Sequence, residues 1–135
     1  MAVPARITII TLGVADLARA TAFYRALGWE PVPPSNGEIT FLATSGSMLA
    51  LFPAADLAAD AGLEEGDRHG FRGVTTAINV DSDDDVVRVL AEAEAAGATV
   101  SRPAAPSPFF DGLDGYFADP DGHVWEVAHN PGIPG

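Results

Sequence analysis

The stretch GYFADPDGHVWEVAHNP, residues 115–131, predicts a β-hairpin whose second strand carries a single acid. Its Asp-Pro-Asp-Gly segment (119–122) suits a type I turn followed by a glycine at positive φ. Residues 113–119 and 123–129 flank this turn and are rich in apolar and aromatic residues, which is typical of strands. Glu126 therefore places a carboxylate in a strand that is otherwise expected to be buried.

This hairpin closes a series of elements that occurs twice along the chain, in the order strand, helix, strand, strand, strand. The first series comprises residues 6–14, 16–28, 29–32, 38–44 and 48–53. The second comprises a strand at 74–80, a helix from Ser82 to Gly97, a short strand at 98–100, a Pro-rich loop at 102–112, and the hairpin.

The two predicted helices begin and end with recognisable signals. Asp16 and Ser82 are N-cap residues, and the second helix adds acids at its positively polarised start. Gly28 and Gly97 are the stops. Each helix has one apolar stripe at helical spacing. The stripe residues are Leu17, Ala20, Tyr24 and Leu27 in the first helix and Val86, Val89, Leu90 and Ala93 in the second.

Because each half must bury one face of its sheet against its helix, the repeat predicts an α+β fold. We expect two βαβββ modules with pseudo-twofold symmetry that form a curved mixed sheet enclosing a cleft. The 135 residues would form one domain, with module 1 at about 4–53 and module 2 at about 73–131. Residues 54–72 are charged and Gly-rich, which predicts a linker with a single helical turn.

Composition excludes several classes of function. The formal net charge of −12, from 19 acids against 7 basic residues, disfavours nucleic acid and favours neutral or cationic partners. With no cysteine, the chain has no disulfide and no thiolate metal site. No signal peptide or membrane span is evident, so we expect a soluble cytoplasmic protein. Triad, P-loop and dinucleotide-binding motifs are also absent from the sequence.

Residues 11–29, TLGVADLARATAFYRALGW, together with the 115–131 hairpin, resemble the vicinal oxygen chelate superfamily. That superfamily includes glyoxalase-type lyases, extradiol dioxygenases, fosfomycin-resistance transferases and bleomycin-resistance binding proteins. The resemblance covers both repeats and implies paired βαβββ modules and often a homodimer. It specifies the fold far better than the function, since the superfamily hosts unrelated activities.

The resemblance also implies where a divalent metal would be held, on the first and last strand of each module. These positions are Ile9, Ala50, Thr75 and Glu126, and a slip of one residue would offer Thr8, Ile10, Val74 or Thr76. Of the four aligned positions only Glu126 carries a strong ligand, so a metal is disfavoured and no cofactor is expected. His69, in the linker, is the remaining candidate ligand, whereas His123 and His129 lie an odd number of residues from Glu126 and face away from it in a straight strand.

Strand alternation predicts which side chains line the cleft if Glu126 faces it. The predicted lining is Ile9, Thr11, Met48, Ala50, Phe52, Thr75, Ala77, Asn79 and Glu126. Phe109, Phe110 and Tyr116 border the Pro-rich loop and could stack on a planar ligand or simply cover the sheet edge. The same alternation puts Trp125 under a helix.

A lone carboxylate among apolar groups is expected to have a raised pKa. Glu126 could pair with Arg6, Arg25, Arg68, Arg72 or Arg102, could contact a cationic ligand, or could act as a general base. The leading hypothesis is a metal-independent binding protein of the bleomycin-resistance type, with an aromatic or cationic ligand. The alternatives are a lyase, isomerase or dioxygenase-like enzyme that uses Glu126 as base or metal ligand, and a protein that keeps the fold for interaction or regulation.

Overall fold

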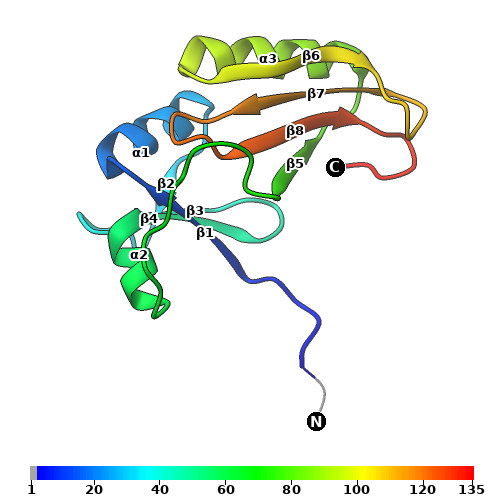
Figure 1. Cartoon of the computed structure of the whole chain (residues 1–135). Helices are drawn as coiled ribbons and strands as arrows, with labels where there is room; N and C mark the ends of the chain where they lie inside the picture. Colours follow the sequence, from blue (N-terminus) through cyan, green and yellow to red (C-terminus); the bar gives the residue numbers. More distant parts are fainter. Residues whose placement is uncertain (1–2) are drawn as a thin grey trace. The chain divides into compact units, whose positions relative to one another are not determined.

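A computed structural model describes residues 3–135, and the chain divides into two compact units (Figure 1). The first unit runs to Asp67 and the second extends from Arg68 to Gly135. Each unit contains one four-stranded mixed sheet, and in both sheets the strands follow the same order. The predicted α+β fold with two βαβββ modules is therefore confirmed.

The first sheet has the strand order β1-β4-β3-β2. Its strands are β1 (Ile9–Val14), β2 (Pro31–Val32), β3 (Thr40–Leu42) and β4 (Met48–Pro53). Strands β1 and β4 run parallel. The long connection through the helix α1 (Leu17–Ala26) and two further strands makes this arrangement possible. The β3–β4 and β2–β3 pairs are antiparallel.

Helix α1 covers one face of this sheet. The Asp16 side chain caps it by accepting a hydrogen bond from the Arg19 backbone N–H at 3.0 Å. Ala20, Phe23 and Tyr24 are buried. The Thr21 hydroxyl lies 2.9 Å from that of Thr40, whose cross-strand partner is Leu51. Leu42, Leu49 and Leu51 thus point toward α1, and all three are buried in the core.

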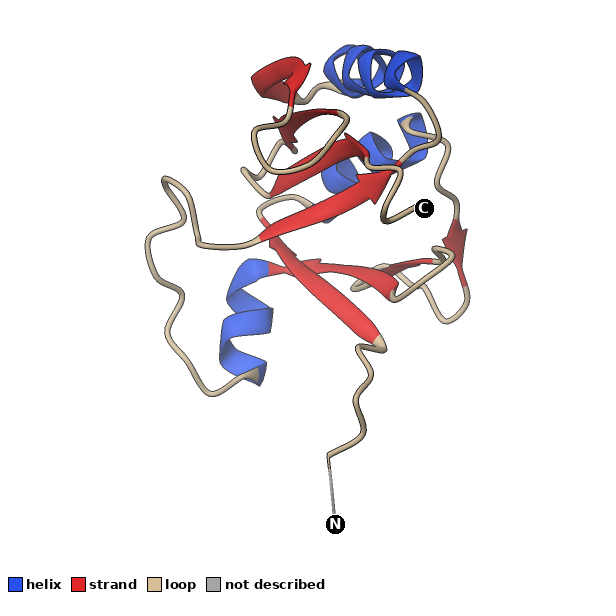
Figure 2. Ribbon diagram, turned by 90° about the vertical axis from the view of Figure 1, so that its right-hand side faces the viewer, coloured by secondary structure: helices blue, strands red, loops and turns tan. Residues whose placement is uncertain are grey.

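A second helix, α2 (Ala54–Asp60), follows β4 directly, where the sequence predicted a linker with a single helical turn. It packs against β1 and β4, as Figure 2 shows. Gly13 permits this contact, since a Cβ there would lie 3.2 Å from the Ala54 Cα and 3.4 Å from the Leu57 side chain. The predicted helix was too short because α2 packs through Leu57 against Gly13 in β1, and such a tertiary contact leaves no local signal in the sequence.

The second sheet has the order β5-β8-β7-β6. Its strands are β5 (Thr75–Asn79), β6 (Thr99–Pro106), β7 (Leu113–Ala118) and β8 (Val124–His129). Here too the first and last strands are parallel and the other pairs are antiparallel. The helix α3 (Asp83–Ala96) connects β5 to β6 and packs on β6, β7 and β8.

Strand β6 is longer than predicted. The sequence favoured a strand over 98–100 and a Pro-rich loop over 102–112, whereas β6 reaches Pro106. Two register shifts, between Val100 and Arg102 and between Arg102 and Ala105, interrupt its pairing with β7. Prolines are tolerated at such irregularities on an edge strand because the missing N–H donors are not needed there.

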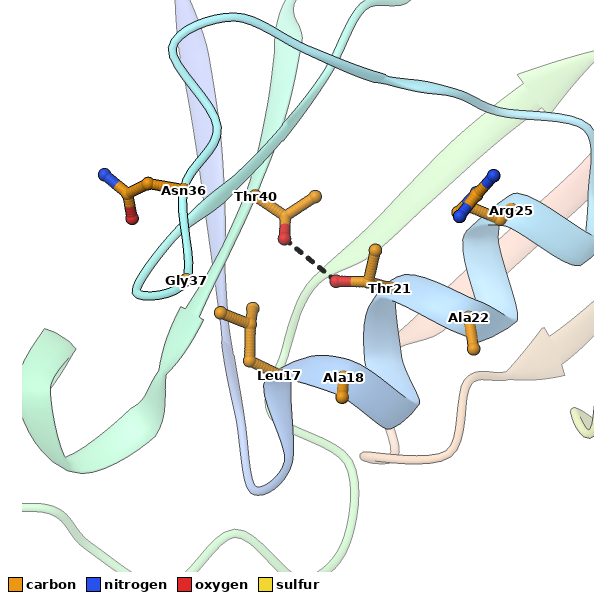
Figure 3. Close-up of a pocket in the computed structure, with 8 residues that line it drawn as sticks. All are labelled: Leu17, Ala18, Thr21, Ala22, Arg25, Asn36, Gly37 and Thr40. Carbon is orange, nitrogen blue, oxygen red and sulfur yellow. Dashed lines mark hydrogen bonds between the residues drawn. The ribbon is translucent and has the colours of Figure 1, made fainter.

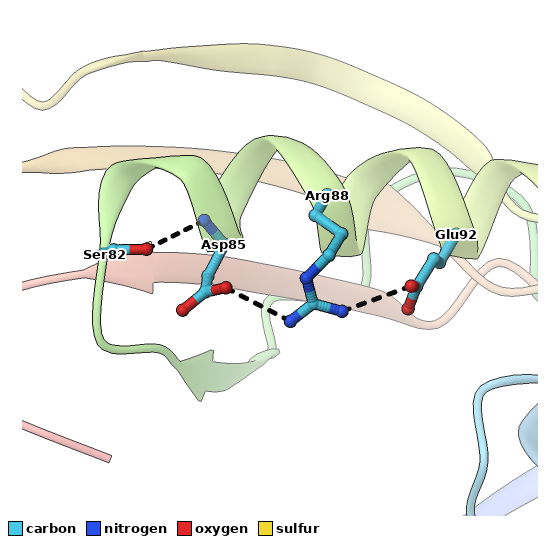
Figure 4. Close-up of polar contacts among 4 residues, drawn as sticks. All are labelled: Ser82, Asp85, Arg88 and Glu92. Atoms are coloured by element: carbon cyan, nitrogen blue, oxygen red, sulfur yellow. Dashed lines mark hydrogen bonds and ion pairs between the residues drawn. The ribbon is translucent and has the colours of Figure 1, made fainter.

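Helix α3 has caps at both ends and ion pairs on its exposed side. The Ser82 hydroxyl accepts a hydrogen bond from the Asp85 backbone N–H at 3.1 Å, and Gly97 ends the helix at φ 118°. Arg88 bridges Asp85 and Glu92 on the exposed side, at 3.3 and 3.2 Å (Figure 4). The opposite side buries Val86, Leu90 and Ala93 against the sheet.

The sheet face under α3 is closely packed. Phe117 and Trp125 are cross-strand partners with parallel rings, 6.3 Å apart between centroids and 8° between planes. Gly115, on the same side of β7 as Phe117, lies so near α3 that a Cβ would come within 2.5 Å of the Leu90 side chain. Trp125 is 3% exposed. The predicted position of Trp125, under a helix, is therefore where the structure has it.

Among residues 3–135, no helix is both long and apolar enough to cross a membrane.

Candidate functional site

Glu126 lies on the face of the second sheet that is opposite α3. Its cross-strand partners are Tyr116 on β7 and Ala77 on β5. Tyr116 is in turn paired with Arg102 on β6. One row of side chains thus runs across all four strands, and it carries a guanidinium, a phenol and a carboxyl group in neighbouring positions.

Asp114 completes this group. It precedes Tyr116 by two residues on β7 and therefore lies on the same face. Its carboxylate forms an ion pair with the Arg102 guanidinium, and its side chain is only 5% exposed, compared with 39% for Arg102. The Arg102 guanidinium carbon also lies 5.2 Å from the centroid of the Tyr116 ring. We refer to Arg102, Asp114, Tyr116 and Glu126 as the acid-pair cluster.

The surroundings of Glu126 in the cluster raise the pKa of its carboxyl group. Burial raises the pKa of Glu126, and both a hydrogen bond with the Asp114 carboxyl and the charge of that carboxylate raise it further. The hydrogen bond with Tyr116 and the positive charge of Arg102 act in the opposite direction but do not reverse the shift. Burial is also the main cause of a raised pKa at Tyr116, followed by the charge of Glu126.

Two carboxyl groups in contact cannot both ionise at low cost, so one of them tends to keep a proton that the other accepts. In this cluster the Arg102 guanidinium forms an ion pair with Asp114, and the raised pKa is that of Glu126. The Glu126 carboxyl group lies on the face opposite α3, with the Tyr116 hydroxyl as a hydrogen-bond partner. Such a group can donate or accept a hydrogen bond, bind a cation after losing its proton, or take up a proton from a bound molecule.

The sequence did not predict Asp114 as part of the site. It suggested Arg102 among five arginines that could pair with Glu126, but Arg102 makes its ion pair with Asp114 instead. The signal was present, since Asp114 and Tyr116 have the spacing of two residues on one strand face. The cross-strand register that brings them beside Glu126 is a tertiary feature that the sequence alone did not provide.

The other residues of the second unit that were predicted to bind a ligand do not gather around Glu126, apart from Ala77. Thr75 and Ala77 are exposed on β5, and Ala77 adjoins Glu126. The Asn79 amide donates to the Ile133 carbonyl at 2.6 Å, which engages it with the C-terminal segment. Phe109 is 91% exposed and Phe110 is half-buried, and both lie in the loop between β6 and β7.

The predicted residues of the first unit share the face of their own sheet that is opposite α1. Ile9 pairs with Met48 and Thr11 pairs with Ala50, while Phe52 is the partner of Gly13. Ala50 is fully buried, whereas Ile9 is 46% exposed. This face is apolar apart from the Thr11 hydroxyl, and α2 covers its end near Gly13.

The first unit also has a pocket that the sequence did not suggest. It lies between α1 and the segment that leads into β3, with a volume of about 370 Å³ (Figure 3). The pocket is lined by Leu17, Ala18, Thr21, Ala22, Arg25, Asn36, Gly37 and Thr40. It is therefore on the helix side of the first sheet, and none of the predicted ligand-binding residues contributes to it.

His123 and His129 contact side chains of the second unit. The His123 Nδ1 lies 3.2 Å from Arg72 Nη1, and the Arg72 guanidinium also donates to the Asp121 carbonyl, which fastens residue 72 to the β7–β8 turn. The His129 Nδ1 lies 2.8 Å from the Asp83 carboxylate at the start of α3. His69 is exposed. Within residues 3–135, no group of three or more His, Asp or Glu side chains is arranged to hold a metal ion.

With this geometry established, comparison with known proteins identifies the family. The sequence model of the Glyoxalase/Bleomycin resistance protein/Dioxygenase superfamily matches residues 6–127. The chain belongs to this superfamily. No match was found among curated proteins.

Solved structures of the superfamily share the fold. A glyoxalase-related enzyme from Fulvimarina pelagi is 39% identical, with a TM-score of 0.86 over 95% of this chain and 90% of that one. A glyoxalase/bleomycin resistance protein/dioxygenase from Nocardioides is 23% identical, with a TM-score of 0.79 over 100% and 93% of the two chains. A lactoylglutathione lyase from Agrobacterium tumefaciens is 24% identical, with a TM-score of 0.68 over 93% and 94%. The last two likenesses show the fold alone.

The residues of this chain do not fit the metal that superfamily enzymes hold. Of the four aligned positions, Ile9 and Ala50 have no donor atom, and Thr75 has a neutral hydroxyl that is a weak ligand. Glu126 supplies one carboxyl group, and the nearest additional carboxylate, Asp114, is already bound to Arg102. A dedicated site for a divalent metal usually needs three or four protein ligands.

Proposed function

We propose that this chain is a metal-independent binding protein for a small organic molecule that carries an amine or an aromatic ring. The ligand would lie on the face of the second sheet opposite α3, with Glu126 and Tyr116 as its polar contacts. The observation that supports this proposal is the Glu126 carboxyl group, which lies between the aromatic side chain of Tyr116 on β7 and the small apolar side chain of Ala77 on β5. Ligand sites commonly combine apolar surface with a few fixed polar groups.

The charge of the chain supports a basic ligand over an acidic one. With a net charge of −12, the chain attracts cations and repels anions over a distance of about 10 Å at ordinary ionic strength. A cationic group beside Glu126 would favour the ionised form of that carboxyl, which burial and Asp114 disfavour in the free protein. Binding of an amine is therefore expected to lower the pKa of Glu126 from its value in the free protein.

A thermal-shift screen of aromatic amines and neutral aromatic compounds tests this proposal, with calorimetry on the compounds that raise the melting temperature. Glu126→Gln is expected to weaken binding of an amine by roughly tenfold or more, because a hydrogen bond to a charged group contributes about 1.5–3 kcal/mol. Glu64→Gln, which removes an exposed acid from the first unit, is the matched control and should bind normally. Equal affinity for all three proteins would exclude Glu126 as the ligand contact.

A second candidate function, proton transfer, is favoured by the raised pKa of Glu126. A carboxyl whose pKa moves toward neutrality is a better general base, and Tyr116 could donate a hydrogen bond to a developing oxyanion. Each compound that binds would be incubated with the protein in deuterated buffer and analysed by mass spectrometry. Deuterium incorporation or product formation that disappears in Glu126→Gln would establish catalysis, whereas unchanged ligand supports the binding function.

A further inference from the structure

Arg102 contacts two other members of the acid-pair cluster, Asp114 and Tyr116. It forms an ion pair with Asp114, whose side chain is 5% exposed, and its guanidinium carbon lies 5.2 Å from the Tyr116 ring centroid. A carboxylate as buried as Asp114 is costly unless a positive charge and hydrogen bonds compensate for lost water. The guanidinium supplies both, and its stacking on Tyr116 fixes its orientation.

The same contacts determine which further cations the cluster can accept. A divalent ion bound by Asp114 and Glu126 would have to displace the guanidinium from Asp114 and break its contact with Tyr116. If the guanidinium stayed, a unit positive charge would remain within a few ångströms of a doubly charged ion. Two like charges this close repel each other near a protein surface, and the double charge of a divalent ion doubles the repulsion.

We propose that the Arg102 guanidinium is the built-in cation of the Asp114 carboxylate and keeps that carboxylate from joining Glu126 in holding a divalent metal ion. The ligand then meets a single remaining carboxyl group, that of Glu126, and not a bound metal. This inference rests on the proposed function and narrows its ligand class to monovalent amines and neutral hydrogen-bonding molecules, excluding compounds that bind by chelating a protein-held metal.

Direct metal titration tests this inference without any organic ligand, so its result does not depend on the ligand screen. Untagged protein would be titrated with Mn²⁺, with free Mn²⁺ followed by electron paramagnetic resonance and binding confirmed by calorimetry. We expect no stoichiometric binding to the native chain. Arg102→Met, which keeps an unbranched side chain and removes its charge, is expected to bind Mn²⁺ at least about tenfold more tightly than the native protein, but still weakly, because two carboxyl groups are fewer than the ligands of a dedicated site.

Three further proteins make the result specific. Arg88→Met removes a guanidinium that bridges Asp85 and Glu92 on the exposed side of α3, so it makes the same change in net charge away from the cluster (Figure 4). Arg102→Lys keeps the positive charge. Neither variant should gain Mn²⁺ binding. Adding Glu126→Gln to Arg102→Met should abolish the gain.

Two results would overturn the inference. One is stoichiometric, low-micromolar Mn²⁺ binding by the native chain that is lost in Glu126→Gln. The other is a folded Arg102→Met protein, verified by circular dichroism, that binds Mn²⁺ no more tightly than Arg88→Met. If Arg102→Met does not fold, Arg102→Gln replaces it, because the Gln amide can still donate a hydrogen bond to the buried Asp114 carboxylate. The same expectations apply to that variant.

Discussion

Asp114 and Glu126 lie diagonally across strands β7 and β8 on one face of the second sheet. The direct partner of Asp114 is Ala128, and that of Glu126 is Tyr116, so the two acids are offset by two residues along the strands. Diagonal neighbours in an antiparallel pair are within reach of long side chains. Burial raises the pKa of Glu126, and the hydrogen bond with Asp114 and the charge of Asp114 raise it further, while Arg102 forms its ion pair with Asp114.

This relationship predicts how stability depends on pH. The folded chain keeps the Glu126 proton to a higher pH than the unfolded chain does, so the folded state binds more protons between the two pKa values. Stability is then lost as pH rises through that interval. Glu126→Gln has no carboxyl group at this position and therefore does not lose this stability as pH rises. The melting temperature of Glu126→Gln should exceed that of the native chain at pH 7. The difference should shrink below the unfolded-state pKa of Glu, which is about 4.3.

Thermal denaturation of the native chain and of Glu126→Gln at several pH values between 3.5 and 7.5, roughly spanning the ordinary carboxyl and histidine range, measures this difference. Glu64→Gln, at an exposed position, controls for the change in net charge. A Glu126→Gln protein that is less stable than the native chain at pH 7 would contradict the raised pKa.

Gly115→Ala is expected to destabilise the second unit. The new methyl group would meet the Leu90 side chain at 2.5 Å and the Arg102 carbonyl oxygen at 3.0 Å, so helix α3 or strand β6 must shift. Overpacking of this kind typically costs about 1–3 kcal/mol. Urea denaturation would measure the loss. Gly46→Ala is the matched control, since a Cβ at Gly46 has no atom within 4 Å, and it should change stability by less than about 0.5 kcal/mol.

Ser82→Ala should destabilise the chain by about 1 kcal/mol, because it removes the side-chain acceptor for the Asp85 N–H at the start of α3. Urea denaturation and the helical circular dichroism signal would both report the loss. Ser45→Ala, in the exposed turn between β3 and β4, is the control. Equal stabilities for the two variants would mean that the Ser82 cap contributes nothing measurable.

The features that the sequence predicted correctly are those encoded locally. Asp16 and Ser82 mark the two helix starts through their own side chains, and Gly97 and Gly122 adopt the positive φ values expected of a helix stop and a turn. Repetition of these local signals was enough to establish the two βαβββ modules. The extent of α2 and of β6 could not be predicted, because each depends on a tertiary contact.

The candidate site was predicted only in part for a similar reason. Strand alternation placed Glu126 on the face opposite Trp125, and Tyr116 was suggested only as a residue bordering the Pro-rich loop. No local pattern specified that Asp114 would bind Arg102 across a strand pair with two register shifts. Those shifts decide which β6 side chain lies over Tyr116, and they cannot be read from a period-two pattern. The pocket between α1 and the segment leading into β3 could not be predicted for the same reason, because residues far apart in the sequence, such as Thr21 and Thr40, line it.

Trp125→Ala is the prediction that tests the facing of β8 directly. Trp125 is 3% exposed, and its ring stacks on Phe117 under α3. Truncation should therefore remove about 3–5 kcal/mol from the free energy of unfolding, the cost usual for a buried aromatic residue. Val124→Ala, at a half-buried position on the opposite face of β8, should cost much less. A loss below about 1 kcal/mol for Trp125→Ala would show that Trp125 does not support the core. Glu126 would then face α3, and the acid-pair cluster could not present it to a ligand.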